Sequence, residues 1–218
     1  MLLVGSVLDR PPGPKYVSVL PFAELALRPP LPRTATLKRR RDELGDLELA
    51  LRAPPSAISS SRGPMRMDDE LERGVGWLLR AGEALGARLL VLPTPPDLTP
   101  GQRSRELLEA YLERLRRDTD TDLVWAPRGP WESEAADALA RQLGLTLAFD
   151  PAVDPRPSGE LVYARLHALG ATRSFSDASL EDALDVIESA PYERAYVAID
   201  SDRSFKQAQR MQALRVAT

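Results

Sequence analysis

The chain has 218 residues, 43% of them hydrophobic and 28% charged, a composition typical of a globular protein. It carries 29 Lys and Arg against 32 Asp and Glu, so no overall positive field attracts a polyanion, and we do not expect nucleic acid as a partner. The absence of cysteine excludes disulfides, thiolate nucleophiles and cysteine metal sites. No segment approaches the roughly 18 apolar residues of a membrane span, and we expect a cytoplasmic protein without membrane contact.

Short apolar runs alternate with segments of helical period along the chain. We expect strands near residues 2–7, 17–20 continuing into 22–27, 47–51, 88–92, 123–126, 145–149, 161–166 and 195–199. About eight strands separated by helices are what a closed parallel barrel uses. The pattern therefore predicts an α/β fold, a TIM-barrel-like β/α barrel, as one domain over residues 1–218.

Two connections do not fit the repeating pattern. Residues 9–15 are too few and too rich in proline for a crossover helix, and residues 151–159 form a Pro- and Asp-containing loop. Because parallel neighbours usually need a crossover of about a dozen residues or more, we expect one or two crossover helices to be missing. The Ser-rich stretch within residues 53–64 is a candidate mobile loop.

Polar side chains gather toward the carboxyl ends of the expected strands, where barrel chemistry is found. Successive strand residues face opposite sides, so Arg165 and His167 share one face of the strand at 161–167, opposite the apolar Val162 and Leu166. The same alternation selects an inward set of Glu24, Arg28, Arg52, Asp150, Arg165, His167 and Asp200.

This inward set holds three acids, three arginines and the single histidine, and it has two interpretations. Isolated charges inside a barrel are costly, so the residues could form a neutral ion-pair network that plugs the barrel mouth. Alternatively they form a site for an anionic ligand. His167 and Glu24 would then be catalytic, and the remaining five would bind the ligand, the arginines as forks for carboxylate or phosphate. The sequence leaves both open.

Two other charged stretches favour a surface role. Lys38–Arg41 is the only basic run, and we interpret it as a solvated helix face neutralised by Asp42 and Glu43 in preference to a phosphate-backbone contact. Asp118–Asp122 begins like a calcium loop, but Leu123 stands where the loop needs glycine. With one histidine and no visible carboxylate cluster, we expect neither a metal nor a cofactor.

The segment Tyr163-Ala164-Arg165-Leu166-His167-Ala168 resembles the YVRLHG strand of the YecE-like family, also called domain of unknown function 72. Other landmarks follow in the family's order, among them Ala23-Glu24-Leu25 for its VEIN stretch and residues 49–54 for its FAVKAP stretch. The resemblance spans nearly the whole chain and implies a TIM-barrel-like fold.

Departures from the family pattern indicate a degenerate polar pocket. The family's EFRH positions fall on Trp125, Ala126, Pro127 and Arg128, so its Glu, Arg and His are absent. Residue by residue, the resemblance carries over Glu24, Arg165 and His167, with Asp150 and Arg52 as further candidates.

Two functions follow as hypotheses. The favoured one is a barrel that binds an anionic small molecule or a protein partner without robust catalysis. The alternative, implied at fold level by the likeness to endonuclease-IV-like barrels, is hydrolysis of a phosphoester or nucleic-acid-related substrate.

Overall fold

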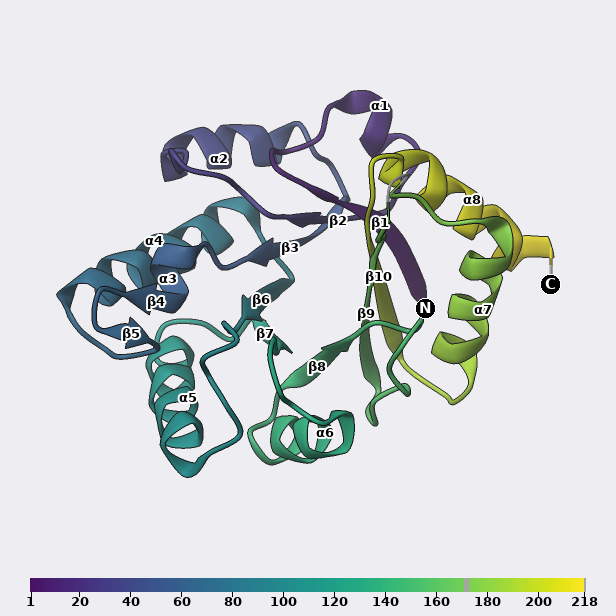
Figure 1. Cartoon of the computed structure of the whole chain (residues 1–218). Helices are drawn as coiled ribbons and strands as arrows, with labels where there is room; N and C mark the ends of the chain where they lie inside the picture. Colours follow the sequence, from purple (N-terminus) through teal and green to yellow (C-terminus); the bar gives the residue numbers. More distant parts are fainter. Residues whose placement is uncertain (171–172, 218) are drawn as a thin grey trace.

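Eight parallel strands close into a barrel in the computed structural model, which describes residues 1–170 and 173–217 (Figure 1). They are β1 (Leu2–Leu8), β2 (Phe22–Leu25), β3 (Glu48–Arg52), β6 (Leu89–Pro93), β7 (Asp122–Ala126), β8 (Thr146–Phe149), β9 (Leu161–His167) and β10 (Arg194–Asp200). Around the barrel they follow the order β1-β10-β9-β8-β7-β6-β3-β2. The predicted TIM-barrel-like fold is confirmed.

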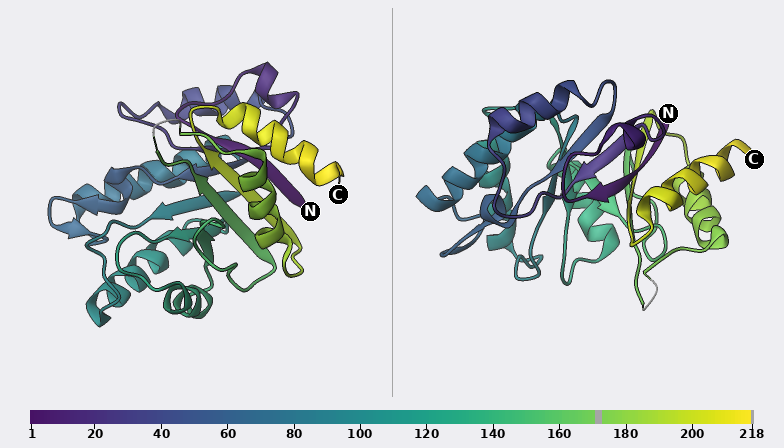
Figure 2. Two further views of the ribbon diagram at one scale, coloured as in Figure 1. Left: turned by 45° about the vertical axis from the view of Figure 1, so that its right-hand side comes forward. Right: turned by 90° about the horizontal axis from the view of Figure 1, so that it is seen from above.

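Helices lie around the outside of this barrel (Figures 1 and 2). They are α1 (Pro14–Val17), α2 (Thr34–Asp42), α3 (Pro55–Ile58), α4 (Asp69–Leu85), α5 (Gln102–Arg116), α6 (Ser133–Gln142), α7 (Asp177–Glu188) and α8 (Ser204–Ala217). Among the residues described, no helix combines the length and apolar character needed to cross a bilayer.

The longest helix shows how local sequence sets its ends. The Asp68 carboxylate accepts hydrogen bonds from the backbone N–H groups of Glu70 and Leu71, which satisfies two of the free donors at the start of α4. At the other end Gly86 adopts a left-handed conformation with φ 57°, which a residue without a Cβ tolerates best. The face between them is buried, with Gly74 against α3 and Gly82 against Leu90 of the barrel strand β6.

Two segments differ from the sequence-based expectation. Residues 17–20 were expected to be part of a strand, but Pro14, whose ring presets a helical φ, starts the one-turn helix α1, and the strand begins only at Phe22. The segment 53–64 is not an irregular loop: it contains α3 and the two-stranded sheet of β4 (Ser59–Ser60) and β5 (Gly63–Pro64). Hydrogen bonds from Ser60 to Asp68 and from Ser61 to Glu70 attach it to α4.

The crossover connections are reduced as predicted. No helix lies between β8 and β9, where residues 150–160 run as turns, bends and irregular backbone. Between β1 and β2 the connection holds only the single turn of α1. Both connections still join neighbouring parallel strands of the closed ring.

The barrel interior is filled by side chains. Its buried inner cluster consists of Leu3, Phe22, Ala50, Leu89, Val91, Val124, Tyr163, Tyr196 and Ala198. The Phe22 ring packs 4.9 Å from that of Tyr196 and stands edge-on to that of Tyr163, at 6.2 Å between centroids. A second, larger core lies between strands and helices. The aromatic layer separates the amino-terminal end of the barrel from polar side chains at the carboxyl-terminal end.

We expect the Tyr16 hydroxyl to make stability fall at alkaline pH. It accepts from the Ser6 N–H and donates to the Phe22 carbonyl, both at 2.7 Å, and burial raises its pKa to about 12. The unfolded chain loses this proton near pH 10, so the associated stability is fully present below pH 10 and falls by up to about 2.7 kcal/mol as the pH rises to about 12. Urea unfolding between pH 9 and 12 should show a shallower decline for Tyr16→Phe than for the wild type. Identical slopes would contradict the assignment.

Candidate functional site

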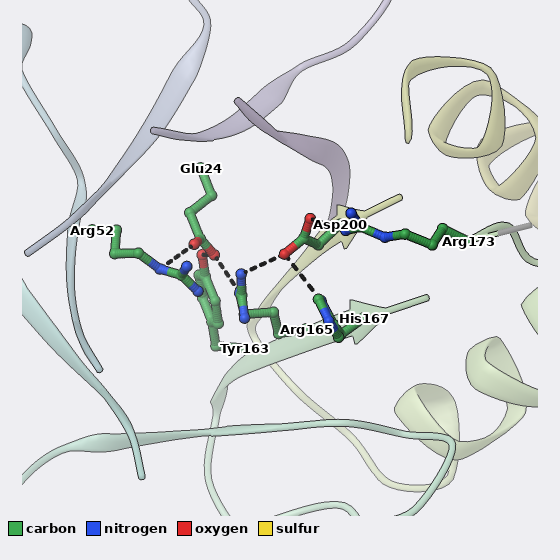
Figure 3. A network of polar contacts seen from close by, with 7 residues as sticks. All are labelled: Glu24, Arg52, Tyr163, Arg165, His167, Arg173 and Asp200. Carbon is green, nitrogen blue, oxygen red and sulfur yellow. Dashed lines mark hydrogen bonds and ion pairs between the residues drawn. The ribbon is translucent and has the colours of Figure 1, made fainter. Parts of the chain in front are cut away.

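Glu24 is the centre of a polar network at the carboxyl-terminal end of the barrel (Figure 3). Its side chain is fully buried, and its Oε2 accepts a 2.7 Å hydrogen bond from the Tyr163 hydroxyl. The Arg165 Nε lies 3.3 Å from the same oxygen. The Arg52 Nε lies 3.0 Å from Oε1, but neither of these two atoms has a hydrogen bond of good geometry. Two arginines and one phenol thus surround one buried carboxylate.

Asp200 extends the network toward solvent. Its Oδ2 accepts a 3.0 Å hydrogen bond from the Arg165 Nη2 and lies 3.1 Å from the His167 Nδ1 (Figure 3). The Arg173 Nη2 lies 3.9 Å from the other carboxylate oxygen. Because β9 and β10 pair in register, with Asp200 opposite His167, the contacts of Asp200 with Arg165 and His167 follow from strand pairing.

Burial shifts the pKa of two members of the network, Tyr163 and Arg52. It raises the pKa of Tyr163 well above its ordinary value, and the adjacent Glu24 carboxylate raises it further. Burial lowers the pKa of Arg52, and the attraction of Glu24 acts in the opposite direction. The Tyr163 hydroxyl therefore stays protonated and donates to the carboxylate.

The structure brings together five of the seven residues selected from the sequence: Glu24, Arg52, Arg165, His167 and Asp200. It does not bring Arg28 or Asp150 into the network. The Arg28 side chain is 81% exposed, and its only ion-pair partner in the described chain is Asp9, at 3.9 Å. The Asp150 carboxylate instead accepts from the Ala152 N–H within its own turn. Both residues lie beyond their strand ends, where the two-residue alternation no longer applies.

A cavity of about 690 Å³ opens above this network. Its charged lining residues are Asp9, Arg28, Arg52, Arg128, Arg173, Asp200 and Asp202. Sequence alternation missed Arg128 and Arg173 because both lie in loops after strands. The sequence did offer one indication for Arg128, because it lies in the segment that aligns with the EFRH motif of the YecE-like family. A hollow of similar size between α4 and α5 contains none of the network residues.

Arg128 is the least constrained of these cations. Within residues 1–170 and 173–217 it has no ion pair or hydrogen bond, although its charge is close enough to lower the pKa of Arg52. Arg173 faces Asp202 at 3.7 Å and Asp200 at 3.9 Å, both long for ion pairs. The cavity therefore presents arginines whose hydrogen-bonding capacity is largely unused.

The acids of the network are not arranged to share a cation. In the described part of the chain, no group of three or more His, Asp or Glu side chains is placed to hold a metal ion. Glu24 and Asp200 each face arginines instead. The donors left over at this site are guanidinium N–H groups, which suit anions.

Among solved structures, the fold of this chain is similar to those of two endonucleases. An AP endonuclease of family 2 from Brucella melitensis is 14% identical over 92% of each chain, with a TM-score of 0.62. Endonuclease IV from Thermus thermophilus is 13% identical over 99% of this chain and 100% of its own, with a TM-score of 0.57.

The chain is also similar to a DUF72 family protein from Enterococcus faecalis. The likeness covers 100% of this chain and 98% of the other, with a TM-score of 0.71 and 14% identity. No family model and no curated protein matches the chain. At 13–14% identity these likenesses establish the fold. The resemblance to the YecE-like family is therefore confirmed for the fold.

Proposed function

We propose that the chain is a divergent YecE-like barrel, one domain over residues 1–218, whose cavity binds an anionic small molecule without robust catalysis. One observation carries this proposal: Arg52, Arg128 and Arg173 line the same cavity at the carboxyl ends of the strands. In TIM barrels this end holds the ligand site. The cations come from β3 and from the loops after β7 and β9.

Arg52 is the strongest candidate for direct contact with the ligand. Its side chain is only 16% exposed, and in the described chain none of its guanidinium N–H groups makes a hydrogen bond of good geometry. A desolvated guanidinium with unused donors is costly, and an anion in the cavity would supply acceptors for them. Glu24 neutralises part of this charge and holds the Nε side of the guanidinium.

The inward set was given two interpretations, an ion-pair plug and an anion site, and each applies to a different depth of the site. Glu24, Tyr163 and Arg165 form a closed, buried layer, which is the plug. Arg128 and Arg173 lie above it on the open cavity. The plug would hold Arg52 in place, and the open layer would receive the ligand.

A phosphoester hydrolase is the second candidate, and His167 is the observation that favours it. Its Nδ1 lies 3.1 Å from Asp200, and its side chain is 45% exposed, so the other ring nitrogen is available for proton transfer. Likeness to two endonucleases agrees with this interpretation at fold level. However, His167 is not among the residues that line the 690 Å³ cavity. For this reason we favour anion binding over hydrolysis.

A ligand panel tests the proposal. We expect inorganic phosphate, glycerol 3-phosphate, AMP or benzoate, tested at constant ionic strength, to raise the thermal midpoint of the wild type. A ligand present at about 100 times its Kd adds about 2.7 kcal/mol to the free energy of unfolding. The Arg52→Gln/Arg128→Gln double variant, which removes the strongest candidate contact and the unpaired cation of the cavity, should lose the shift. Arg103→Gln, on an exposed face of α5, should keep it.

The same samples separate the two candidate functions. If no anion shifts the midpoint, or if the shift persists in the double variant, the binding proposal is wrong. Release of inorganic phosphate from the phosphoesters, abolished by His167→Gln, would instead establish the hydrolase.

A further inference from the structure

The cavity above the network is chemically two-sided. On one side lie the charged side chains Arg128 and Arg173, from the loops after β7 and β9, with Asp200 at the end of β10 and Asp202 in the loop that follows it. The ends of β1, β3 and β6 and the segments that follow β1, β2, β3 and β6 contribute the other side. Its apolar members include Val7, Leu8, Leu27 and Ile58, and its charged members are Asp9, Arg28 and Arg52. A ligand that fills this space must offer both a charged group and an apolar surface.

Proline dominates the apolar side. Six prolines line the cavity: Pro29, Pro54, Pro55, Pro93, Pro95 and Pro96. A proline has no backbone N–H, so these segments offer few donors to a ligand. A phosphate group needs donors around three oxygens, whereas an apolar ligand body needs only contact. Away from Arg28 and Arg52, this side of the cavity therefore suits hydrocarbon better than a second anionic group.

The charge balance points to a ligand with one negative charge. The positive side chains of the cavity and its floor are Arg28, Arg52, Arg128, Arg165 and Arg173, and the negative ones are Asp9, Glu24, Asp200 and Asp202. Among these nine side chains, arginines exceed acids by one. A monoanion neutralises this excess, whereas a dianionic phosphate monoester leaves a net negative charge beside Asp200 and Asp202.

Arg52 has the geometry to receive such a group. It ends β3 immediately before Ala53 and Pro54, so it stands where the charged floor meets the apolar side. Its planar guanidinium matches the two oxygens of a carboxylate through parallel N–H donors. In the part of the chain that the structure describes, both of its Nη groups lack a hydrogen-bond partner.

We infer that the ligand is a monocarboxylate with an apolar body, and that Arg52 binds its carboxylate while the proline-rich side contacts the body. This inference rests on the proposed anion-binding function and narrows it to one ligand class. The cavity of about 690 Å³ lies within the usual range for small-molecule sites and can enclose a body of one aromatic ring or more.

Calorimetric titration of the full chain with matched compounds tests the inference. The probes are phenylacetate, phenyl phosphate, acetate and the neutral phenylacetamide. We expect phenylacetate to bind about tenfold or more tightly than each of the other three, because only it combines one negative charge with an apolar body. Arg52→Gln should weaken phenylacetate binding about tenfold or more, and Arg52→Lys, which keeps the charge but loses the fork, should weaken it less.

The possible results separate this inference from the broader proposal. Tighter binding of phenyl phosphate would overturn the carboxylate assignment and leave anion binding standing. Equal binding of acetate and phenylacetate would overturn the role of the apolar side. Equal binding of phenylacetamide would overturn both proposals. If none of the four probes binds, the monocarboxylate inference is wrong, and the phosphate and AMP arms of the ligand panel decide the broader proposal. Arg103→Gln serves as the charge-matched control, and circular dichroism checks that each Arg52 variant is folded.

Discussion

Glu24→Gln is expected to lower the free energy of unfolding by about 3–5 kcal/mol, the usual cost of removing one partner from a buried ion pair. The amide has nearly the shape of the carboxylate and can still accept from the Tyr163 hydroxyl, so little packing is lost. What is lost is the negative charge between Arg52 and Arg165, whose side chains are only 16% and 15% exposed. Two poorly solvated guanidinium groups then repel each other without a counter-charge.

Chemical denaturation at neutral pH measures this loss. Glu160→Gln is the matched control, because Glu160 is exposed just before β9, and its side chain has no ion pair in the described chain. It should change the unfolding free energy by no more than about 0.5 kcal/mol. The double variant Glu24→Gln/Arg52→Gln should lose less unfolding free energy than the sum of the two single losses. Each single variant already removes the Glu24–Arg52 attraction, so the sum counts that attraction twice. A Glu24→Gln variant as stable as the control would show that the network contributes no net stability.

Gly74→Ala is the second change with a large expected effect. A Cβ added at Gly74 would lie 1.8 Å from the carbonyl oxygen of Ser56 and 2.9 Å from the backbone nitrogen of Ala57. These are backbone atoms of α3, so no side-chain rotation relieves the clash, and α3 and α4 must separate. We expect a loss of about 3 kcal/mol, the upper end of the range for overpacking.

Gly76→Ala on the same helix is the control for Gly74→Ala. Its added Cβ would meet only the end of the flexible Arg80 side chain, at 3.2 Å, so it should be neutral or stabilise α4 by up to about 1 kcal/mol. The thermal midpoints of the two variants should therefore shift in opposite directions or differ by several degrees. Their urea midpoints should differ in the same sense. Equal stabilities would mean that α3 shifts away from α4 at little cost.

Repetition and alternation allowed much of this molecule to be predicted from its residues. Eight apolar runs predicted a closed parallel barrel, and the two-residue period placed Glu24, Arg165 and His167 on the inner face. That worked because the pleat of a strand is a local property: once a segment is extended, alternate side chains must face opposite sides. The reduced connection over residues 150–160 was also predictable, because a Pro- and Asp-containing loop cannot supply a crossover helix.

Only the tertiary structure decided which charges meet and which ones line the cavity. Glu24 lies 28 residues from Arg52 and 141 from Arg165, and their contacts depend on ring closure and strand register. Arg128 and Arg173 reach the cavity from loops, and Asp150 turns back onto its own backbone. Loop conformation has no sequence period, since it follows from hydrogen bonds and packing with residues distant in the chain. The sequence by itself therefore determined the barrel and the inward face of its strands, whereas the pairing of charges and the residues around the cavity depended on how the closed barrel packs.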